Sequence, residues 1–137
     1  MTAQQLDGRA VSSAIRAEVK AEVEKLTAEH DIVPGLATVL VGEDPASKTY
    51  VEMKQNQCRK AGMNAFERVV SETISQEELE GVIAELNADP EVHGILVQLP
   101  LPDHLDEDRI LAAIALEKDV DGFHPTNIAR LALQDVE

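Results

Sequence analysis

Four side chains in this 137-residue chain have the types and spacing to move protons on a small organic ligand: Lys54, Tyr50, Ser47 and Gln98. The polar stretch "SKTYVEMKQNQ" (47–57) predicts a helix, and at about 100° per residue its Ser47, Tyr50 and Lys54 fall within roughly 60° of arc. A helix N-terminus disfavours a further cation nearby. A lysine shifted toward its neutral form can accept and return protons, and a phenol ring beside it offers a flat stacking surface.

The same residues also fit a purely structural interpretation, because the spacing Y-x-x-x-K is a weak signal by itself. Ser47 follows "EDPA" and is a candidate helix N-cap, Tyr50 can pack its ring on a sheet, and Lys54 can lie in solvent. Cys58 lies one turn after Lys54 and could reach the same region, although burial as a small apolar residue is the favoured interpretation.

Two further positions make the functional interpretation stronger. "GILVQLP" (94–100) is apolar except for Gln98 near its carboxyl end, where parallel sheets bind ligands. An amide there could hold the lysine amine or a ligand heteroatom, or it could be a satisfied capping group. In "KDVDG" (118–122), Asp121 is either a turn residue or a carboxylate that accepts two hydrogen bonds from an N–C–N edge such as a pterin presents.

The hydrophobic pattern predicts the elements that must position these residues. Apolar residues at steps of three and four, with Asp7 as the expected N-cap, predict a helix over 6–30. The run 36–42 is apolar and β-branched without alternation, as is typical of a central parallel strand. Three more helices are expected, at 47–61, 75–89 (opened by a Ser75–Glu78 capping box) and 106–116. Two more strands are expected, at 65–70 and within 93–102, where Pro100 and Pro102 interrupt the strand.

Strands that alternate with helices of this length indicate an α/β fold built from βαβ units. We expect a mostly parallel sheet with helices on both faces, in a three-layer αβα arrangement. Thr126 is the expected cap of a last helix. The final "RLALQDVE" (130–137) continues a helical pattern without a C-cap, so we expect the chain to stop inside an element.

Composition excludes several classes of function. Twelve basic and 26 acidic residues give a net charge of −14, which argues against binding to nucleic acid or to an anionic membrane. One cysteine permits no internal disulfide and fits a reducing compartment, and four histidines without metal-binding spacing predict no metal cofactor. No signal peptide is evident, and no apolar run approaches the ~20 residues of a membrane span. We therefore expect a soluble, cytoplasmic protein.

Three strings taken together resemble one family. "VGEDPASKTYVEMKQNQCRKAGM" (41–63), "GILVQLPLP" (94–102) and "KDVDGFHPTNIARL" (118–131) closely resemble the amino-terminal domain of bifunctional methylenetetrahydrofolate dehydrogenase/cyclohydrolases. The resemblance covers essentially the whole chain. It implies hydride transfer from 5,10-methylenetetrahydrofolate to NADP, followed by hydration of the methenyl cation to 10-formyltetrahydrofolate.

The resemblance also implies a role for each residue of the matched strings. Lys54 is the acid/base group that polarises the one-carbon bridge, and Tyr50 stacks on the folate. Gln98 positions Lys54, and Asp121 anchors the pterin edge. Four more residues are implied to line or shape the substrate pocket: Ser47, Pro100, Leu101 and Asp119.

The family continues into a second, NADP-binding Rossmann domain for which this chain has no glycine-rich nucleotide loop. The resemblance thus implies a folate-binding catalytic domain at 1–121, and at 122–137 the start of a linker to a missing cofactor domain. Hydride transfer by this chain alone is not expected. A carboxyl-terminal helix that braces the first domain in the family is also missing, which implies an uncovered apolar face. The full-length enzyme is implied to be a homodimer, and this chain a monomer or a weakly associated species.

Two alternatives stay open at this point. The chain could be a standalone folate-binding or regulatory module without catalysis. A short-chain dehydrogenase also uses Ser, Tyr and Lys with Y-x-x-x-K spacing, but its glycine-rich nucleotide loop precedes that motif. Here "LATVLVGEDPAS" (36–47) contains a single glycine, which makes this class the weaker alternative.

Overall fold

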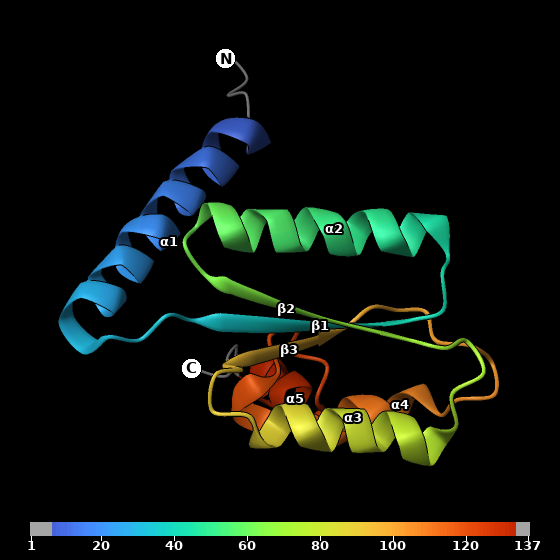
Figure 1. The fold of residues 1–137 in the computed structure, drawn as a ribbon. Coiled ribbons are helices and arrows are strands. Elements are labelled where there is room, and N and C mark those ends of the chain that lie inside the picture. The colour runs from blue at the N-terminus through green and yellow to red at the C-terminus, as the bar shows by residue number, and fades with distance from the viewer. Residues whose placement is uncertain (1–6, 134–137) are drawn as a thin grey trace.

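The computed structural model describes residues 7–133 as three parallel strands and surrounding helices (Figure 1). The elements in chain order are α1 (Gly8–His30), β1 (Gly35–Val41), α2 (Pro45–Lys60), β2 (Asn64–Val70), α3 (Gln76–Ala88), β3 (Gly94–Val97), α4 (Glu107–Ala113), the 3₁₀ turn η1 (Leu116–Lys118) and α5 (Pro125–Leu133).

The sheet has the order β2-β1-β3, and both pairings are parallel. The central strand β1 pairs with β2 along its whole length and with β3 from Leu36 to Val39. Figure 1 shows α1 and α2 on one face of the sheet and α3, α4 and α5 on the other. The expected three-layer αβα fold with a parallel sheet is confirmed.

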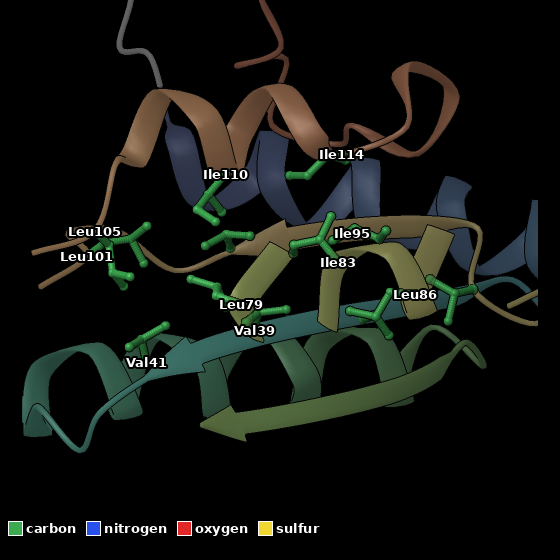
Figure 2. Close-up of a cluster of buried hydrophobic side chains, with 13 residues drawn as sticks. Val39, Val41, Leu79, Ile83, Leu86, Ile95, Leu101, Leu105, Ile110 and Ile114 are labelled. Atoms are coloured by element: carbon green, nitrogen blue, oxygen red, sulfur yellow. The ribbon is translucent and has the colours of Figure 1, made fainter. Parts of the chain in front are cut away.

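The main hydrophobic core lies on the α3–α4 face of the sheet. Side chains of β1 and β3 that point to this face, such as Val39 and Ile95, meet Ile83 of α3 and Ile110 of α4, all four fully buried (Figure 2). Alternation along β1 sends Thr38 to the opposite face, against α2. That face therefore has a partly polar contact with its helix, which bears on the functional site.

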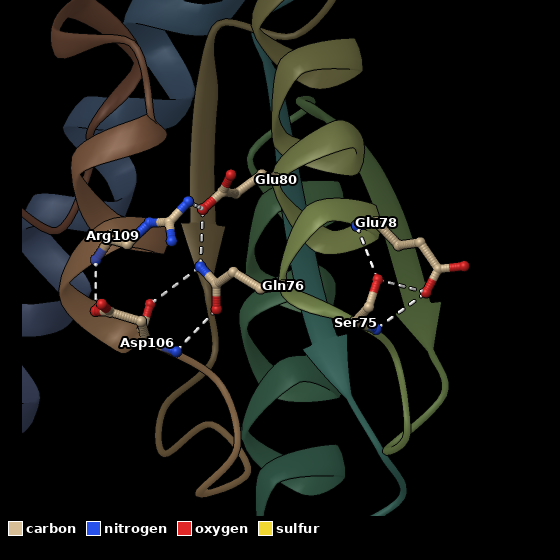
Figure 3. Close-up of polar contacts among 6 residues, drawn as sticks. All are labelled: Ser75, Gln76, Glu78, Glu80, Asp106 and Arg109. Atoms are coloured by element: carbon tan, nitrogen blue, oxygen red, sulfur yellow. Dashed lines mark hydrogen bonds and ion pairs between the residues drawn. The ribbon is translucent and has the colours of Figure 1, made fainter.

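Two of the four N-caps considered in the sequence are confirmed. Asp7 caps α1 by accepting from the backbone N–H of Arg9 at 2.9 Å. The Ser75–Glu78 capping box opens α3 (Figure 3). Ser47, in contrast, is not an N-cap. Its own N–H donates to Asp44 Oδ2 at 2.8 Å, because Pro45 takes the first helical position and leaves Asp44 as the cap.

Two expected elements end or begin at other residues. The third strand stops at Val97, ahead of the interruption expected at Pro100, which has no N–H for the ladder. The helix expected over 106–116 ends at Ala113, and η1 follows. Thr126 is not the cap of α5, which begins at Pro125. The N–H of Thr126 instead lies 3.2 Å from Nδ1 of His124.

A polar contact fixes the start of α4 to the start of α3 (Figure 3). Gln76 Oε1 accepts from the N–H of Asp106 at 2.8 Å, and Gln76 Nε2 donates to Glu80 Oε1 at 2.8 Å. Arg109 of α4 also pairs with Glu80 at 2.8 Å. These contacts fix the end of the loop that runs from β3 to α4 and carries Pro100 and Leu101.

The long helix α1 is amphipathic, as expected, but most of its apolar face is exposed. Only Val23 is buried, whereas Val11 is 59% exposed and Ile15 53%. Within residues 7–133, no helix is long and apolar enough to cross a membrane.

The core predicts a large difference between two isoleucine truncations. Ile83→Ala removes a fully buried side chain, so it should lower the free energy of unfolding by about 2–5 kcal/mol in urea denaturation. Ile15→Ala makes the same chemical change on the exposed face of α1 and should cost less than about 1 kcal/mol. Equal losses for the two variants would contradict this placement of the core.

Candidate functional site

The lysine and the glutamine singled out in the sequence meet in space. Lys54 Nζ, from the third turn of α2, donates to Gln98 Oε1 at 3.2 Å across 44 residues of sequence. Both side chains are partly buried. An ammonium has three N–H donors. Because Gln98 is the one hydrogen-bond partner of Lys54 within residues 7–133, the remaining donors are available to a ligand.

Gln98 is fixed before it reaches the lysine. Its backbone N–H donates to the carbonyl of Val39 at 2.9 Å and so extends the β1–β3 ladder by one residue. Its side-chain Nε2 donates to the carbonyl of Leu99 at 2.9 Å. With the NH₂ group committed there, Oε1 points to Lys54, and the amide acts toward the lysine as an acceptor.

Asp121 approaches the same place from the other edge of β3. A parallel bridge joins Ile95 to Asp119, so the segment that follows runs beside β3 toward its carboxyl end. Gly94 permits this approach, since a Cβ there would lie 2.5 Å from Val120 Cγ1. Asp121 is therefore brought to the end of β3, where Gln98 and Lys54 lie.

The electrostatics of Asp121 reflect this position. Loss of hydration raises the pKa of its carboxyl group above the ordinary value. The positive charge of Lys54 acts in the lowering direction, and the negative charge of Asp119 again raises the pKa. A carboxyl group with a shifted pKa beside a lysine is a candidate member of a functional site, and Asp121 is exposed enough for a ligand to reach it.

Asp119 organises the loop that follows it. Its Oδ2 accepts from the N–H of His124 and from Nδ2 of Asn127, both at 2.9 Å. Partial burial raises the pKa of this carboxyl group. Hydrogen bonds from Asn127 and from the backbone N–H groups of residues 122–124 outweigh that effect, so the net pKa is lowered. Asp119 shapes the pocket indirectly, by folding the 119–127 segment.

Of the remaining predicted residues, three line a cleft and the fourth, Tyr50, is exposed. Ser47, Pro100 and Leu101 line a cleft of about 570 Å³ at the carboxyl end of β1. Tyr50 does not pack its ring on the sheet, because 56% of the residue is exposed. It lies one helical turn before Lys54, which places its ring next to the lysine on the same side of α2. Cys58 is half-buried and lines a different cavity, between α1 and α2.

Sequence reasoning missed a buried polar network next to the lysine. Gln55 is 3% exposed, and its Nε2 donates to Thr38 Oγ1 at 2.7 Å and to the carbonyl of Phe66 at 3.3 Å. Its Oε1 accepts from Arg59 at 2.8 Å. The network joins α2 to β1 and β2 and fixes the rotation of α2, and with it the direction of Lys54. A hydroxyl within the otherwise apolar run "LATVLV" was the available signal.

Comparison with known proteins decides the family. Residues 6–121 match the family described as "Tetrahydrofolate dehydrogenase/cyclohydrolase, catalytic domain". The chain belongs to this family. The "Bifunctional protein FolD 2" of Myxococcus xanthus is 56% identical over 133 residues, which are 97% of this chain and 46% of that protein. The "Bifunctional protein FolD" of Moorella thermoacetica is 54% identical over 135 residues, which are 98% of this chain and 48% of that protein. The chain thus spans about half the length of the curated relatives it matches.

Solved structures of the tetrahydrofolate dehydrogenase/cyclohydrolase family have the same fold. The bifunctional enzyme FolD of Campylobacter jejuni superposes with a TM-score of 0.90 at 47% identity, covering 93% of this chain and 45% of that one. The Trypanosoma brucei enzyme, solved with NADP and an inhibitor, superposes with a TM-score of 0.92 at 36% identity. The match covers 100% of this chain and 47% of the Trypanosoma brucei chain. These similarities confirm the resemblance found in the three sequence strings.

The start of α2 does not fit the phosphates of a dinucleotide such as the NADP of the Trypanosoma brucei complex. The turn from β1 to α2 is where a dinucleotide phosphate would approach a helix N-terminus. Here the Asp44 carboxylate already accepts from the N–H of Ser47. Hydrogen bonds from the backbone and side chain of Ser47 lower the pKa of Asp44, so this end of the helix keeps its negative charge. Glu43 and Glu72 line the same cleft and would repel a phosphate further.

The buried network predicts a coupled effect of two substitutions. Gln55→Leu removes the amide that donates to Thr38 and to the carbonyl of Phe66, so it should lower the free energy of unfolding by about 1–3 kcal/mol. Adding Thr38→Val removes the hydroxyl left without its donor and should recover part of that loss. Gln57→Leu, an exposed position on the same helix, is the matched control. Strictly additive losses in chemical denaturation would contradict a shared network.

The raised pKa of Asp121 predicts that its carboxylate lowers the free energy of unfolding in a pH-dependent way. The native state holds the proton more tightly than the unfolded state, so this group lowers stability as pH rises from its ordinary pKa to the raised native value. Asp121→Asn should therefore be more stable than the unaltered chain at pH 7, with the difference vanishing below about pH 3. Thermal unfolding across this range measures it, and a variant less stable at pH 7 would refute the assignment.

Proposed function

We propose that this chain is the folate-binding catalytic half of an enzyme that interconverts 5,10-methylenetetrahydrofolate, 5,10-methenyltetrahydrofolate and 10-formyltetrahydrofolate. The observation that carries the proposal is the contact of Lys54 with Gln98 at the carboxyl ends of β1 and β3, in a chain of this family. Asp121 approaches the same point, and the exposed Tyr50 ring lies one turn away. Family membership and side-chain geometry thus favour the same small set of residues.

In the hydrolytic step, Lys54 handles the protons. Water adds to the electrophilic methenyl carbon and loses one proton to solvent as the new C–O bond forms. The Lys54 ammonium then donates a proton to N5 as the C–N5 bond breaks, and the amine so formed takes the hydroxyl proton, which leaves the formyl group on N10 and restores the ammonium. Gln98 Oε1 accepts one N–H throughout and fixes the direction of the amine.

Asp121 and Tyr50 hold the pterin and its neighbouring ring in this proposal. The Asp121 carboxylate accepts two hydrogen bonds from the N–C–N edge of the pterin, which replace the water it has lost. Tyr50 offers its exposed ring for stacking. Ser47, Pro100 and Leu101 form the wall of the adjoining cleft.

Dehydrogenase activity with NADP is proposed for the whole protein, not for these residues. The curated relatives extend to about twice the matched length, and we assign the cofactor site to that further half. The negative charge at the start of α2 supports this division of labour. Hydride transfer therefore needs the further half of the protein.

A standalone folate-binding or regulatory module is the second candidate, and the exposed Tyr50 fits binding without chemistry equally well. Turnover separates the two, since a module would bind folate without hydrolysing the methenyl form. We further propose a cytoplasmic enzyme that is a homodimer at full length, with this chain alone monomeric or weakly associated. Sedimentation of the chain as a tight dimer would contradict the last point.

The role of Lys54 is tested by Lys54→Met in a chimaera that joins this chain to the unmatched half of a FolD relative. Loss of methenyl absorbance reports hydrolysis, and the rate should fall about 10²–10⁴-fold. Affinity for tetrahydrofolate should change far less. Lys60→Met, on an exposed position of the same helix, should keep the unaltered rate. Normal hydrolysis by Lys54→Met would remove the lysine from the mechanism.

A further inference from the structure

Lys118, which immediately precedes the two aspartates of "KDVDG", is fully committed to the end of a distant helix. Its Nζ donates to the carbonyls of Leu86, Asn87 and Asp89 at 3.2, 2.7 and 2.9 Å. These carbonyls belong to the carboxyl end of α3, which has no basic residue in its own last turn. Lys118 thus supplies the cation that the negative end of the α3 dipole favours, from about thirty residues further along the chain.

The three acceptors use all three donors of the ammonium group. Lys118 therefore has no N–H left for a ligand and cannot be a substrate-binding residue in this conformation. Asn87 adds a second connection, because its Nδ2 donates to the carbonyl of Ala113 at 2.8 Å and its Oδ1 accepts from Ala115 at 2.9 Å. Both ends of the η1 turn are in this way attached to α3.

The attachment has a direct consequence for the site. Asp119 follows Lys118 and forms the bridge to Ile95 of β3, and Asp121 lies two residues later, at most about 7 Å along the chain. Val120 rests against Gly94 between them. The place of the Asp121 carboxyl group is therefore set by where η1 ends, and η1 ends at Lys118.

We propose that Lys118 is a positioning residue, which holds Asp121 beside Lys54 and Gln98 by tying η1 to the carboxyl end of α3. The inference deepens the proposed function, on which it rests for the identity of the ligand but not for the geometry. A simple helix cap would contribute stability alone. A positioning residue also controls the surroundings of the Asp121 carboxyl group, and this difference can be measured without any ligand.

The first measurement is an NMR titration of the Asp121 carboxyl carbon in the folded chain. In the unaltered protein, the pKa of Asp121 should be raised, because the carboxyl group has lost hydration. In Lys118→Met, a released loop should rehydrate the group, and the pKa should return toward the ordinary value. Lys118→Arg keeps the charge and part of the hydrogen bonding, so it should retain most of the shift. If the methionine variant does not fold, Lys118→Gln, which loses the charge but keeps one N–H donor group, takes its place with the same expected return of the pKa toward the ordinary value.

A control separates positioning from general loss of stability. Gln76→Ala breaks the contact between α3 and α4 at the opposite end of α3 and leaves Lys118 untouched. It should lower stability while the pKa of Asp121 stays raised. A pKa of Asp121 that stays raised in the folded Lys118→Met variant would overturn the proposal.

The second measurement is the affinity for tetrahydrofolate by isothermal titration calorimetry. Lys118→Met should weaken binding about tenfold, and it should have no further effect in an Asp121→Asn background, since the two residues act through one contact. Equal losses in both backgrounds would overturn the positioning role. An unaltered chain that does not bind tetrahydrofolate would instead refute the proposed function, and the titration of Asp121 would still decide the role of Lys118.

Discussion

The parallel pairing of β1 with β3 is the constraint on which the site depends. It brings the carboxyl ends of two strands to one edge, and the ladder continues through the N–H of Gln98 to the carbonyl of Val39. A backbone hydrogen bond therefore sets where the Gln98 side chain begins. The direct Lys54 contact and the approach of Asp121 both follow from that one register. A slip by one residue would turn Gln98 to the other face of the sheet.

The two faces of the sheet contribute in different ways. The α3–α4 face is a close-packed apolar core, which supplies stability and tolerates little change of volume. The α2 face has a buried amide and a hydroxyl where the other face has aliphatic side chains. Hydrogen bonds are directional, so such a contact fixes the rotation of a helix more sharply than apolar packing does. The helix that carries the proposed acid/base group is the one held in this way.

Much of this arrangement was predictable from the sequence, for physical reasons. Uninterrupted apolar runs indicate a covered parallel strand, and caps such as Asp7 and Ser75 act within one turn of the chain. The meeting of Lys54 with Gln98 could be suggested because parallel strands align their carboxyl ends. The long-range contacts of Lys118 could not, since nothing local distinguishes its side chain from a solvated one. For Gln55 the one signal was the Thr38 hydroxyl in an apolar strand, which does not say which side chain reaches it. The prediction of Ser47 as the cap of α2 is wrong because Pro45 takes the first helical position, so the cap is Asp44, three residues earlier.

Because most of its apolar face is exposed, α1 should unfold locally at a lower free energy than the sheet and α3. A helix of 23 residues with one buried side chain gains little from tertiary packing, and its own propensity sustains it only marginally in water. The α1 amides should therefore exchange with solvent deuterium through local fraying, far ahead of those in β1 and α3. Because α2 is held to the sheet by its own polar network, α1 can open and close without moving Lys54. The slowest-exchanging amides should then trace the sheet and α3, the same elements that fix the candidate site.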